Sequence, residues 1–183
     1  QTGMGRTGSL WAYQQTPVRP DVITTAKALG GGVAIGACIT SPDTAGVLSP
    51  GDHGSTFAAG PVAASAAMAV LDIVDTPETL RRVRELGDRL TRSLLEVEGV
   101  SEVRGRGLMV GVGLEDGIDA AAVNTALLGK GLIVNAPRPD TLRLLPPFVI
   151  SDEQLDIAVE KIAEALGEAR NENLKETNAG GTK

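Results

Sequence analysis

A single lysine lies where an apolar segment gives way to a run of glycines. Residues 22–26 read Val-Ile-Thr-Thr-Ala, and Lys27 is followed by Ala-Leu and three glycines. The β-branched residues predict a strand that ends at Lys27, and glycine lets the backbone come close to a group beside the amine. Partial shielding from water disfavours the charged form of such a lysine, whose neutral amine can form a Schiff base with an aldehyde cofactor. The alternative is a surface lysine in a glycine-rich turn.

A hydroxyl group precedes the start of a predicted helix. Thr56 ends the segment Gly54-Ser55-Thr56, and Pro61 opens an alanine-rich stretch that is typical of a helix. Free backbone N–H groups near a helix start, together with a hydroxyl, suit an anion such as phosphate. The alternative is an ordinary turn.

An arginine interrupts the apolar run of residues 142–145. On a strand, alternation places Arg143 on one face with Leu145, while Leu142 and Leu144 face the other way. A guanidinium held in this way can bind a carboxylate through two parallel hydrogen bonds. The alternative is a structural ion pair with an acid elsewhere in the chain.

Four ordered segments carry these residues and resemble the class-III pyridoxal phosphate (PLP) aminotransferases. They read Gly-Arg-Thr-Gly-Ser-Leu-Trp-Ala-Tyr-Gln (5–14), Pro-Asp-Val-Ile-Thr with Ala-Lys-Ala-Leu-Gly-Gly-Gly (20–24 and 26–32), His-Gly-Ser-Thr-Phe (53–57) and Thr-Leu-Arg-Leu-Leu-Pro-Pro (141–147). Residues 50–57 and 138–147 are most similar to the acetylornithine aminotransferase branch of that family. One departure is Ala58-Ala59 after Phe57, where the family usually has two glycines.

The resemblance implies an α/β protein of PLP-dependent transferase fold type I. It implies that Lys27 holds PLP, and that Thr56 reaches the phosphate of the neighbouring subunit's cofactor in a homodimer. Gln1 resembles the glutamine that hydrogen-bonds the phenolic oxygen of the cofactor. Arg143 would hold the substrate α-carboxylate, and Ser55 would contact the substrate.

The activity implied is transfer of an amino group between N-acetylornithine and 2-oxoglutarate through a Schiff base on Lys27, in arginine biosynthesis. Ornithine, succinylornithine or 4-aminobutyrate aminotransferase is the alternative within the family. The chain opens at Gln1, three places after the family's aspartate that pairs with the pyridinium nitrogen. We therefore expect a C-terminal fragment of a longer enzyme, and the alternative is an inactive fragment or a non-catalytic interaction module.

The composition excludes several other classes of function. The chain has 183 residues, a net charge of −6 and no basic block, which argues against a nucleic-acid or anionic-membrane partner. Neither a membrane span nor a signal pattern is visible, so a cytoplasmic location is expected. Cys38, the only cysteine, is predicted to be a core residue, and His53, the only histidine, lies in no metal-ligand spacing. Aromatic residues make up only 2%, so the core must be aliphatic.

The pattern of apolar residues predicts three regions. Residues 1–75 are expected to form the C-terminal part of a large mixed-sheet domain, residues 76–168 a small α+β domain, and residues 169–183 a polar, disordered tail. In the first region we expect a strand at 22–24 and another at 34–40 that is buried on both faces. An almost wholly buried helix should run from Pro61 to about Val74.

The second region contains clear start and stop signals. Thr76-Pro77-Glu78 predicts a helix start, and an apolar stripe then follows at helical spacing until Gly99. A hairpin is predicted around residues 105–107, a helix from Asp119 to about Gly129, and strands at 132–134 and 142–145. Residues 151–154 read as a capping box that starts the last helix.

Overall fold

The chain divides into two compact units, residues 1–82 and residues 83 onwards. The computed structural model describes the backbone of residues 1–56, 58 and 60–180, and side chains within these ranges as far as residue 171. The boundary between the units lies inside a helix, a few residues after the predicted boundary at 75. This helix begins in one unit and contributes its later turns to the core of the other.

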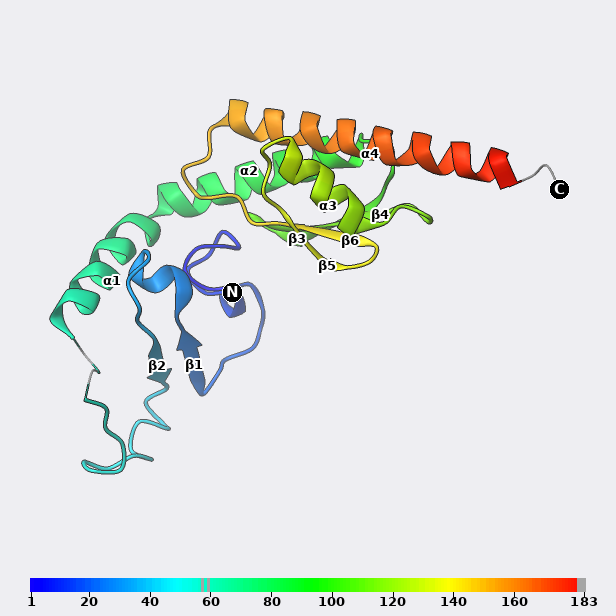
Figure 1. Ribbon diagram of the computed structural model, residues 1–183. Helices are drawn as coiled ribbons and strands as arrows, with labels where there is room; N and C mark the ends of the chain where they lie inside the picture. Colours follow the sequence, from blue (N-terminus) through cyan, green and yellow to red (C-terminus); the bar gives the residue numbers. More distant parts are fainter. Residues whose placement is uncertain (57, 59, 181–183) are drawn as a thin grey trace. The chain divides into compact units, whose positions relative to one another are not determined.

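The first unit contains a two-stranded antiparallel sheet. Strand β1 (Val22–Thr25) pairs with β2 (Ala37–Thr40), with Val22 opposite Thr40 and Thr25 opposite Ala37 (Figure 1). The connection holds only the 3-10 helix η2 (Lys27–Gly30) and a turn. Such a short connection favours antiparallel pairing, because parallel strands need a longer crossover. A mixed sheet contains both parallel and antiparallel pairs of strands, and β1 with β2 forms an antiparallel pair.

The strand predicted to be buried on both faces is exposed. Strand β2 begins at Ala37 rather than at Ala34, and each of its residues is exposed. Cys38 is therefore an exposed free thiol and not a core residue. The apolar sequence predicts burial only if further layers cover both faces, and a pair of strands by itself supplies none.

Helix α1 (Pro61–Val74) has the predicted bounds but not the predicted burial. Ala67 packs with Leu29 and Met4 in a small core, and Val74 is also buried. Three large apolar residues of the helix are exposed: Val62, Met68 and Ile73. Only one stripe of α1 is covered in the described chain, although its small residues would permit packing all round.

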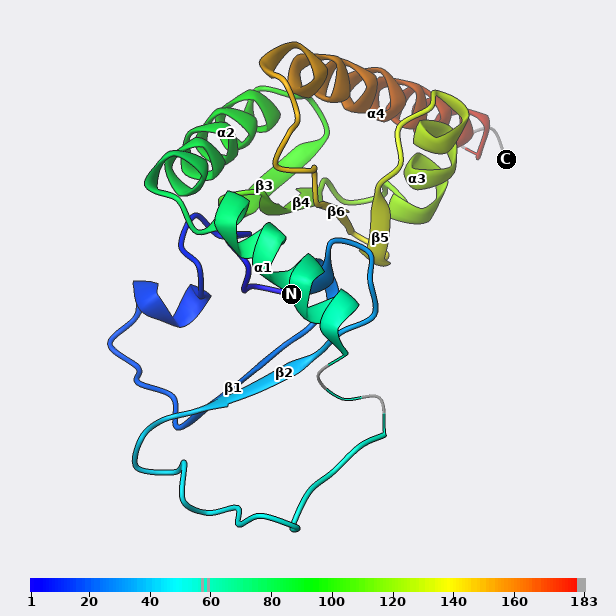
Figure 2. The same ribbon diagram turned by 90° about the vertical axis from the view of Figure 1, so that its left-hand side faces the viewer.

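The second unit is a four-stranded antiparallel sheet with helices on one face (Figure 2). Its elements are α2 (Pro77–Leu95), β3 (Val100–Arg106), β4 (Met109–Leu114), α3 (Ala120–Gly129), β5 (Asn135–Arg138), β6 (Thr141–Leu144) and α4 (Asp152–Gly180). The strand order is β3-β4-β6-β5. This arrangement agrees with the predicted α+β region.

The core of this unit lies between the sheet and the helices. Helix α2 supplies Val83, Leu86, Leu90 and Leu94, which are all almost completely buried and follow the predicted stripe. The covered face of the sheet supplies alternate residues of β4 and β6: Val110, Val112, Leu114, Leu142 and Leu144. Aliphatic side chains make up this core, as the low aromatic content requires.

Several local signals in the sequence have the predicted structure. The Thr76 hydroxyl accepts a hydrogen bond from the Thr79 N–H (3.1 Å), and the Asp119 carboxylate caps α3. At the start of α4, the Gln154 side chain accepts from Ser151 N–H (3.0 Å) and the Ser151 hydroxyl accepts from Gln154 N–H (3.1 Å). These bonds satisfy N–H groups that a helix start leaves without partners.

Two elements differ from the prediction. The strand expected at 132–134 is β5 (Asn135–Arg138), because Leu132 and Val134 pack against the core ahead of the paired segment. Pro137 is tolerated because β5 is an edge strand. The α4 backbone stays helical to Gly180, past residue 168 where the apolar spacing fades. Each further residue adds one backbone hydrogen bond to a helix that is already started, so the helix can continue beyond its apolar stripe.

Candidate active site

Lys27 opens η2 and is separated from the end of β1 only by Ala26, so it lies at the predicted end of the strand. Its φ is +53°, a left-handed conformation that is uncommon for residues other than glycine. The side chain is exposed rather than partly shielded, and it forms no hydrogen bond or ion pair with any described residue. The amine is therefore accessible, and the unusual backbone fixes the direction in which the side chain leaves the turn.

The glycines after Lys27 are needed for different structural reasons. A Cβ on Gly30 would lie 2.7 Å from Ile35 Cγ2, and a Cβ on Gly31 would lie 3.0 Å from Val70 Cγ2 on α1. Nothing lies within 4 Å of the corresponding position on Gly32, whose φ is +112°. Gly30 and Gly31 thus allow close packing of the turn, and Gly31 (φ +59°) and Gly32 both have a conformation that favours glycine.

Thr56 lies in the loop before α1, and its side chain is exposed together with that of Ser55. Gly60 provides no side-chain cap, and the Ala64 N–H donates to the Gly60 carbonyl at 3.0 Å. The N–H groups of the first helical turn point away from any intrahelical acceptor, at the positive end of the helix dipole. Thr56 precedes this helix start by five residues in the sequence, and a hydroxyl near a helix start suits a phosphate group. Ala59, part of the departure from the family, lies outside the described residues, as does Phe57.

Arg143 lies on the open face of the four-stranded sheet. Leu142 and Leu144 are buried on the other face, and Leu145 is 42% exposed, so the predicted alternation is confirmed. In register, Arg143 is opposite Gly111 of β4 and Asn135 of β5. Its side chain is half-buried.

The guanidinium of Arg143 is left incompletely satisfied. Its Nε is buried and has no hydrogen-bond partner, and no described acid forms an ion pair with Arg143. An unsatisfied buried donor is costly, and a carboxylate from a ligand would remove that cost. The structural ion pair considered as the alternative is not present among the described residues.

Gln1 is exposed, and it belongs to the first unit together with Lys27, Ser55 and Thr56. Arg143 belongs to the second unit. Each residue thus has the local environment described above within its own unit. The described side chains contain no cluster of His, Cys, Asp and Glu suited to a metal ion, and no described helix has the length and apolarity to cross a membrane.

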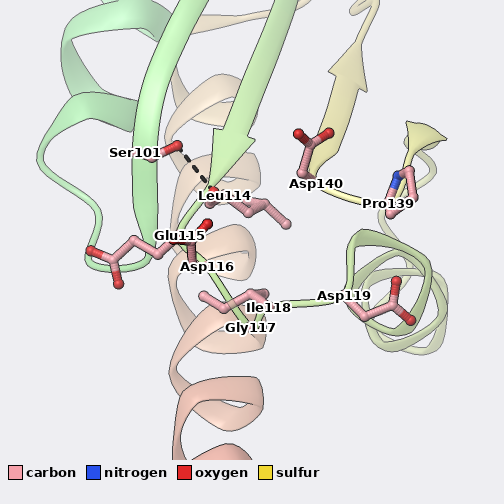
Figure 3. Close-up of a pocket in the computed structure, with 9 residues that line it drawn as sticks. All are labelled: Ser101, Leu114, Glu115, Asp116, Gly117, Ile118, Asp119, Pro139 and Asp140. Carbon is pink, nitrogen blue, oxygen red and sulfur yellow. Dashed lines mark hydrogen bonds between the residues drawn. The ribbon is translucent and has the colours of Figure 1, made fainter.

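A pocket in the second unit contains none of the predicted site residues (Figure 3). It is lined by Ser101, Leu114, Glu115, Asp116, Gly117, Ile118, Asp119, Pro139 and Asp140. Two of its carboxylates have structural partners: Asp119 caps α3, and Asp140 accepts a hydrogen bond from the Thr141 hydroxyl at 2.9 Å. The acidic lining is unsuited to anionic substrate or cofactor groups.

Two arginines with defined environments were not singled out by sequence reasoning. Arg6 lies in the glycine-rich segment near the start, where burial lowers the pKa of its guanidinium. Arg104 of β3 lies on the same face of the sheet as Arg143, because both are opposite Gly111 in register. The hairpin pattern predicts the strand that carries Arg104. That Arg143 lies two strands away on the same face depends on the order of strands in the sheet.

The comparison with protein families matches residues 1–166 to the family model Aminotransferase class-III. The chain belongs to the class-III aminotransferases. Curated relatives include an acetylornithine aminotransferase of Corynebacterium efficiens, 47% identical over 168 residues, and one of Mycobacterium bovis, 46% identical over 159 residues. These alignments cover 92% and 85% of the chain, and 41% and 39% of the two relatives.

Solved class-III aminotransferases share the fold. The ornithine aminotransferase of Toxoplasma gondii has a TM-score of 0.84 and 33% identity, over 93% of this chain and 42% of that one. The N-acetylornithine aminotransferase of Stenotrophomonas maltophilia has a TM-score of 0.80 and 35% identity, and the match covers 92% of this chain and 45% of that one. The fold class predicted from sequence is confirmed. The chain spans about two fifths of the length of the curated relatives it matches.

Proposed function

We propose that the protein is a PLP-dependent aminotransferase that moves an amino group between N-acetylornithine and 2-oxoglutarate. The observation that carries the proposal is Lys27, a lysine with an accessible, unpaired amine in the segment Ala-Lys-Ala-Leu-Gly-Gly-Gly, inside the region that the family model matches. Acetylornithine aminotransferases among the curated relatives favour N-acetylornithine over ornithine, succinylornithine or 4-aminobutyrate as the amino donor. The same proposal includes participation in arginine biosynthesis and a location in the cytoplasm.

The residues of this chain have chemistry that suits the cofactor. Lys27 would hold PLP through its amine and, once released, would move the substrate α-proton as a general base. Thr56 and the start of α1 would bind the phosphate of the neighbouring subunit's cofactor in a homodimer. Gln1 would hydrogen-bond the phenolic oxygen of the cofactor. When bound, PLP supplies an electron sink for the carbanion formed by proton removal.

Substrate recognition would depend on Arg143 and Ser55. The unsatisfied Nε of Arg143 is suited to a carboxylate, and its guanidinium can bind both carboxylate oxygens. Ser55, exposed next to Thr56, would contact the substrate through its hydroxyl. Arg143 would thereby orient the α-carbon, and Lys27 would act on its proton.

Borohydride trapping tests the proposal. The protein is incubated with PLP, reduced with sodium borohydride and digested, and the peptides are examined by mass spectrometry. A pyridoxyl group is expected on Lys27, with the Lys27→Ala variant as the control that loses it. Labelling of Lys130 or Lys161 in preference to Lys27 would contradict the assignment. Because Lys27 is itself exposed, a non-catalytic interaction module would label Lys27 no more than the other accessible lysines.

A further inference from the structure

Two glycines create a shallow trough on the open face of the four-stranded sheet. Gly111 and Gly113 of β4 lie opposite Arg104 and Glu102 of β3. A Cβ on Gly113 would lie 2.7 Å from Glu102 Cγ, and one on Gly111 would lie 3.5 Å from Arg104 Cγ. Glu102 therefore occupies the space that a side chain at position 113 would fill, and Arg104 lies in ordinary contact distance above Gly111.

Arg104 is fixed in this trough by polar contacts at both ends of its guanidinium. Its Nη1 forms an ion pair with Glu102 Oε1, and its Nη2 donates to the Thr141 hydroxyl of β6 at 3.1 Å. Thr141 in turn donates to Asp140 Oδ1 at 2.9 Å. Arg104 thus spans from β3 to β6 and has its charge compensated by Glu102.

Arg143 shares this face but has no such compensation. Arg104, Gly111 and Arg143 form one row across β3, β4 and β6. Glu102 lies one row away, and from strand spacing its Cα is about 12 Å from that of Arg143. Extended glutamate and arginine side chains can together span this separation. Glu102 is therefore paired with Arg104 and unavailable to Arg143.

We propose that Arg104 is a positioning residue that sequesters Glu102, so that Arg143 stays open to an external carboxylate. This inference rests on the proposed role of Arg143 as the substrate carboxylate ligand. Without Arg104, Glu102 is free to swing across Gly111 and pair with Arg143 as an internal competitor. The glycines of β4 are what makes this movement sterically possible, because a side chain at either position would obstruct it.

Titration with acetate, observed through the Arg143 Nε–Hε resonance in ¹⁵N NMR spectra of the chain, tests the inference. Arg143→Lys assigns the resonance, and sodium chloride at equal ionic strength controls for salt. Arg104→Gln should weaken acetate binding about two- to fivefold, the range expected for a competing exposed ion pair. Without acetate, Arg104→Gln should already shift the resonance toward its acetate-bound position, and adding Glu102→Gln should abolish both effects.

Matched variants separate sequestration from a general effect of charge. Arg106→Gln removes the same charge two residues along β3 and should change acetate affinity less than Arg104→Gln. Arg104→Lys keeps a cation for Glu102 and should retain the wild-type affinity, and Glu102→Gln alone should change it little. An equal loss for Arg106→Gln, or a loss in Arg104→Gln that the second substitution leaves in place, overturns the inference.

The same titration distinguishes this inference from the proposed function. If the wild-type resonance does not respond to acetate, the carboxylate role of Arg143 fails, and the sequestration inference fails with it. If the wild type responds and Arg104→Gln behaves identically, only the sequestration inference fails. Thermal unfolding of each variant verifies that the sheet is intact.

Discussion

At the scale of single residues, Lys27 combines a left-handed backbone with an accessible amine. A non-glycine residue in this conformation costs about 1–2 kcal/mol relative to the right-handed region. Such strain is typical of residues whose side-chain direction matters more than local stability. At Arg143 the cost takes another form, a buried Nε without an acceptor. Both residues therefore carry local costs, and at Arg143 a bound carboxylate would offset that cost.

Replacing Lys27 separates the strain from the chemistry. Lys27→Gly and Lys27→Ala both remove the amine, but only glycine adopts φ of +53° without steric cost. We expect Lys27→Gly to be more stable than Lys27→Ala by about 1 kcal/mol, after allowance for the entropy of glycine in the unfolded chain. Urea unfolding followed by fluorescence of Trp11, the only tryptophan, measures this difference in the first unit. Equal midpoints would show that the backbone at Lys27 is unstrained.

At the scale of elements, α2 is held against its neighbours mainly by close packing. Arg89 of α2 binds Asp152 (2.7 Å) and Asp156 (2.5 Å) of α4. Desolvation acts to lower the pKa of Arg89, but hydrogen bonds and charge interactions with Asp156 and Asp152 raise it overall. These groups are substantially exposed, and exposed ion pairs contribute little to stability. The apolar stripe of α2, almost completely buried, is the larger contribution.

Two helical glycines provide a matched test of this packing. A Cβ on Gly87 of α2 would lie 2.2 Å from the Gly107 carbonyl oxygen in the β3–β4 turn, whereas Gly167 of α4 has nothing within 4 Å. Gly87→Ala should lower the free energy of unfolding by about 1–3 kcal/mol through overpacking against backbone. Gly167→Ala should raise it by up to about 1 kcal/mol through helix propensity. Urea unfolding followed by far-UV circular dichroism compares them, and a stabilising Gly87→Ala would contradict the close approach.

At the scale of the whole molecule, the two units differ in how much core they contain. Eighteen buried apolar residues form the described core of the second unit, and three form that of the first. Several apolar side chains of the first unit remain exposed: Val22, Ile39, Val62, Met68 and Ile73. Because burial of apolar surface is the main favourable contribution to folding, the local stability of the two units should differ.

Hydrogen exchange measured by mass spectrometry tests this difference. Amides of β4 and β6, which lie in the interior of the four-stranded sheet, should exchange at least about tenfold more slowly than those of β1 and β2. The two-stranded sheet has few buried side chains to protect its hydrogen bonds from local opening. Equal protection in the two sheets would show that the size of the described core does not determine local stability here.

The sequence by itself determined the features that depend on neighbours close along the chain. The capping box at residues 151–154, the stripe of α2, the bounds of α1 and the face on which Arg143 lies are all local patterns, and each was predicted. The family was also predictable, because its ordered motifs are themselves local. Periodicity and capping require no knowledge of what packs against an element.

Only the tertiary structure decided burial and long-range partners. The apolar run that becomes β2 was predicted to be buried, yet Cys38 is exposed, because burial depends on layers that a local pattern cannot report. The left-handed backbone of Lys27 and the row that aligns Arg104 with Arg143 likewise required the fold. A strand's sequence encodes which side chains share its face, whereas the order of strands in the sheet selects their neighbours.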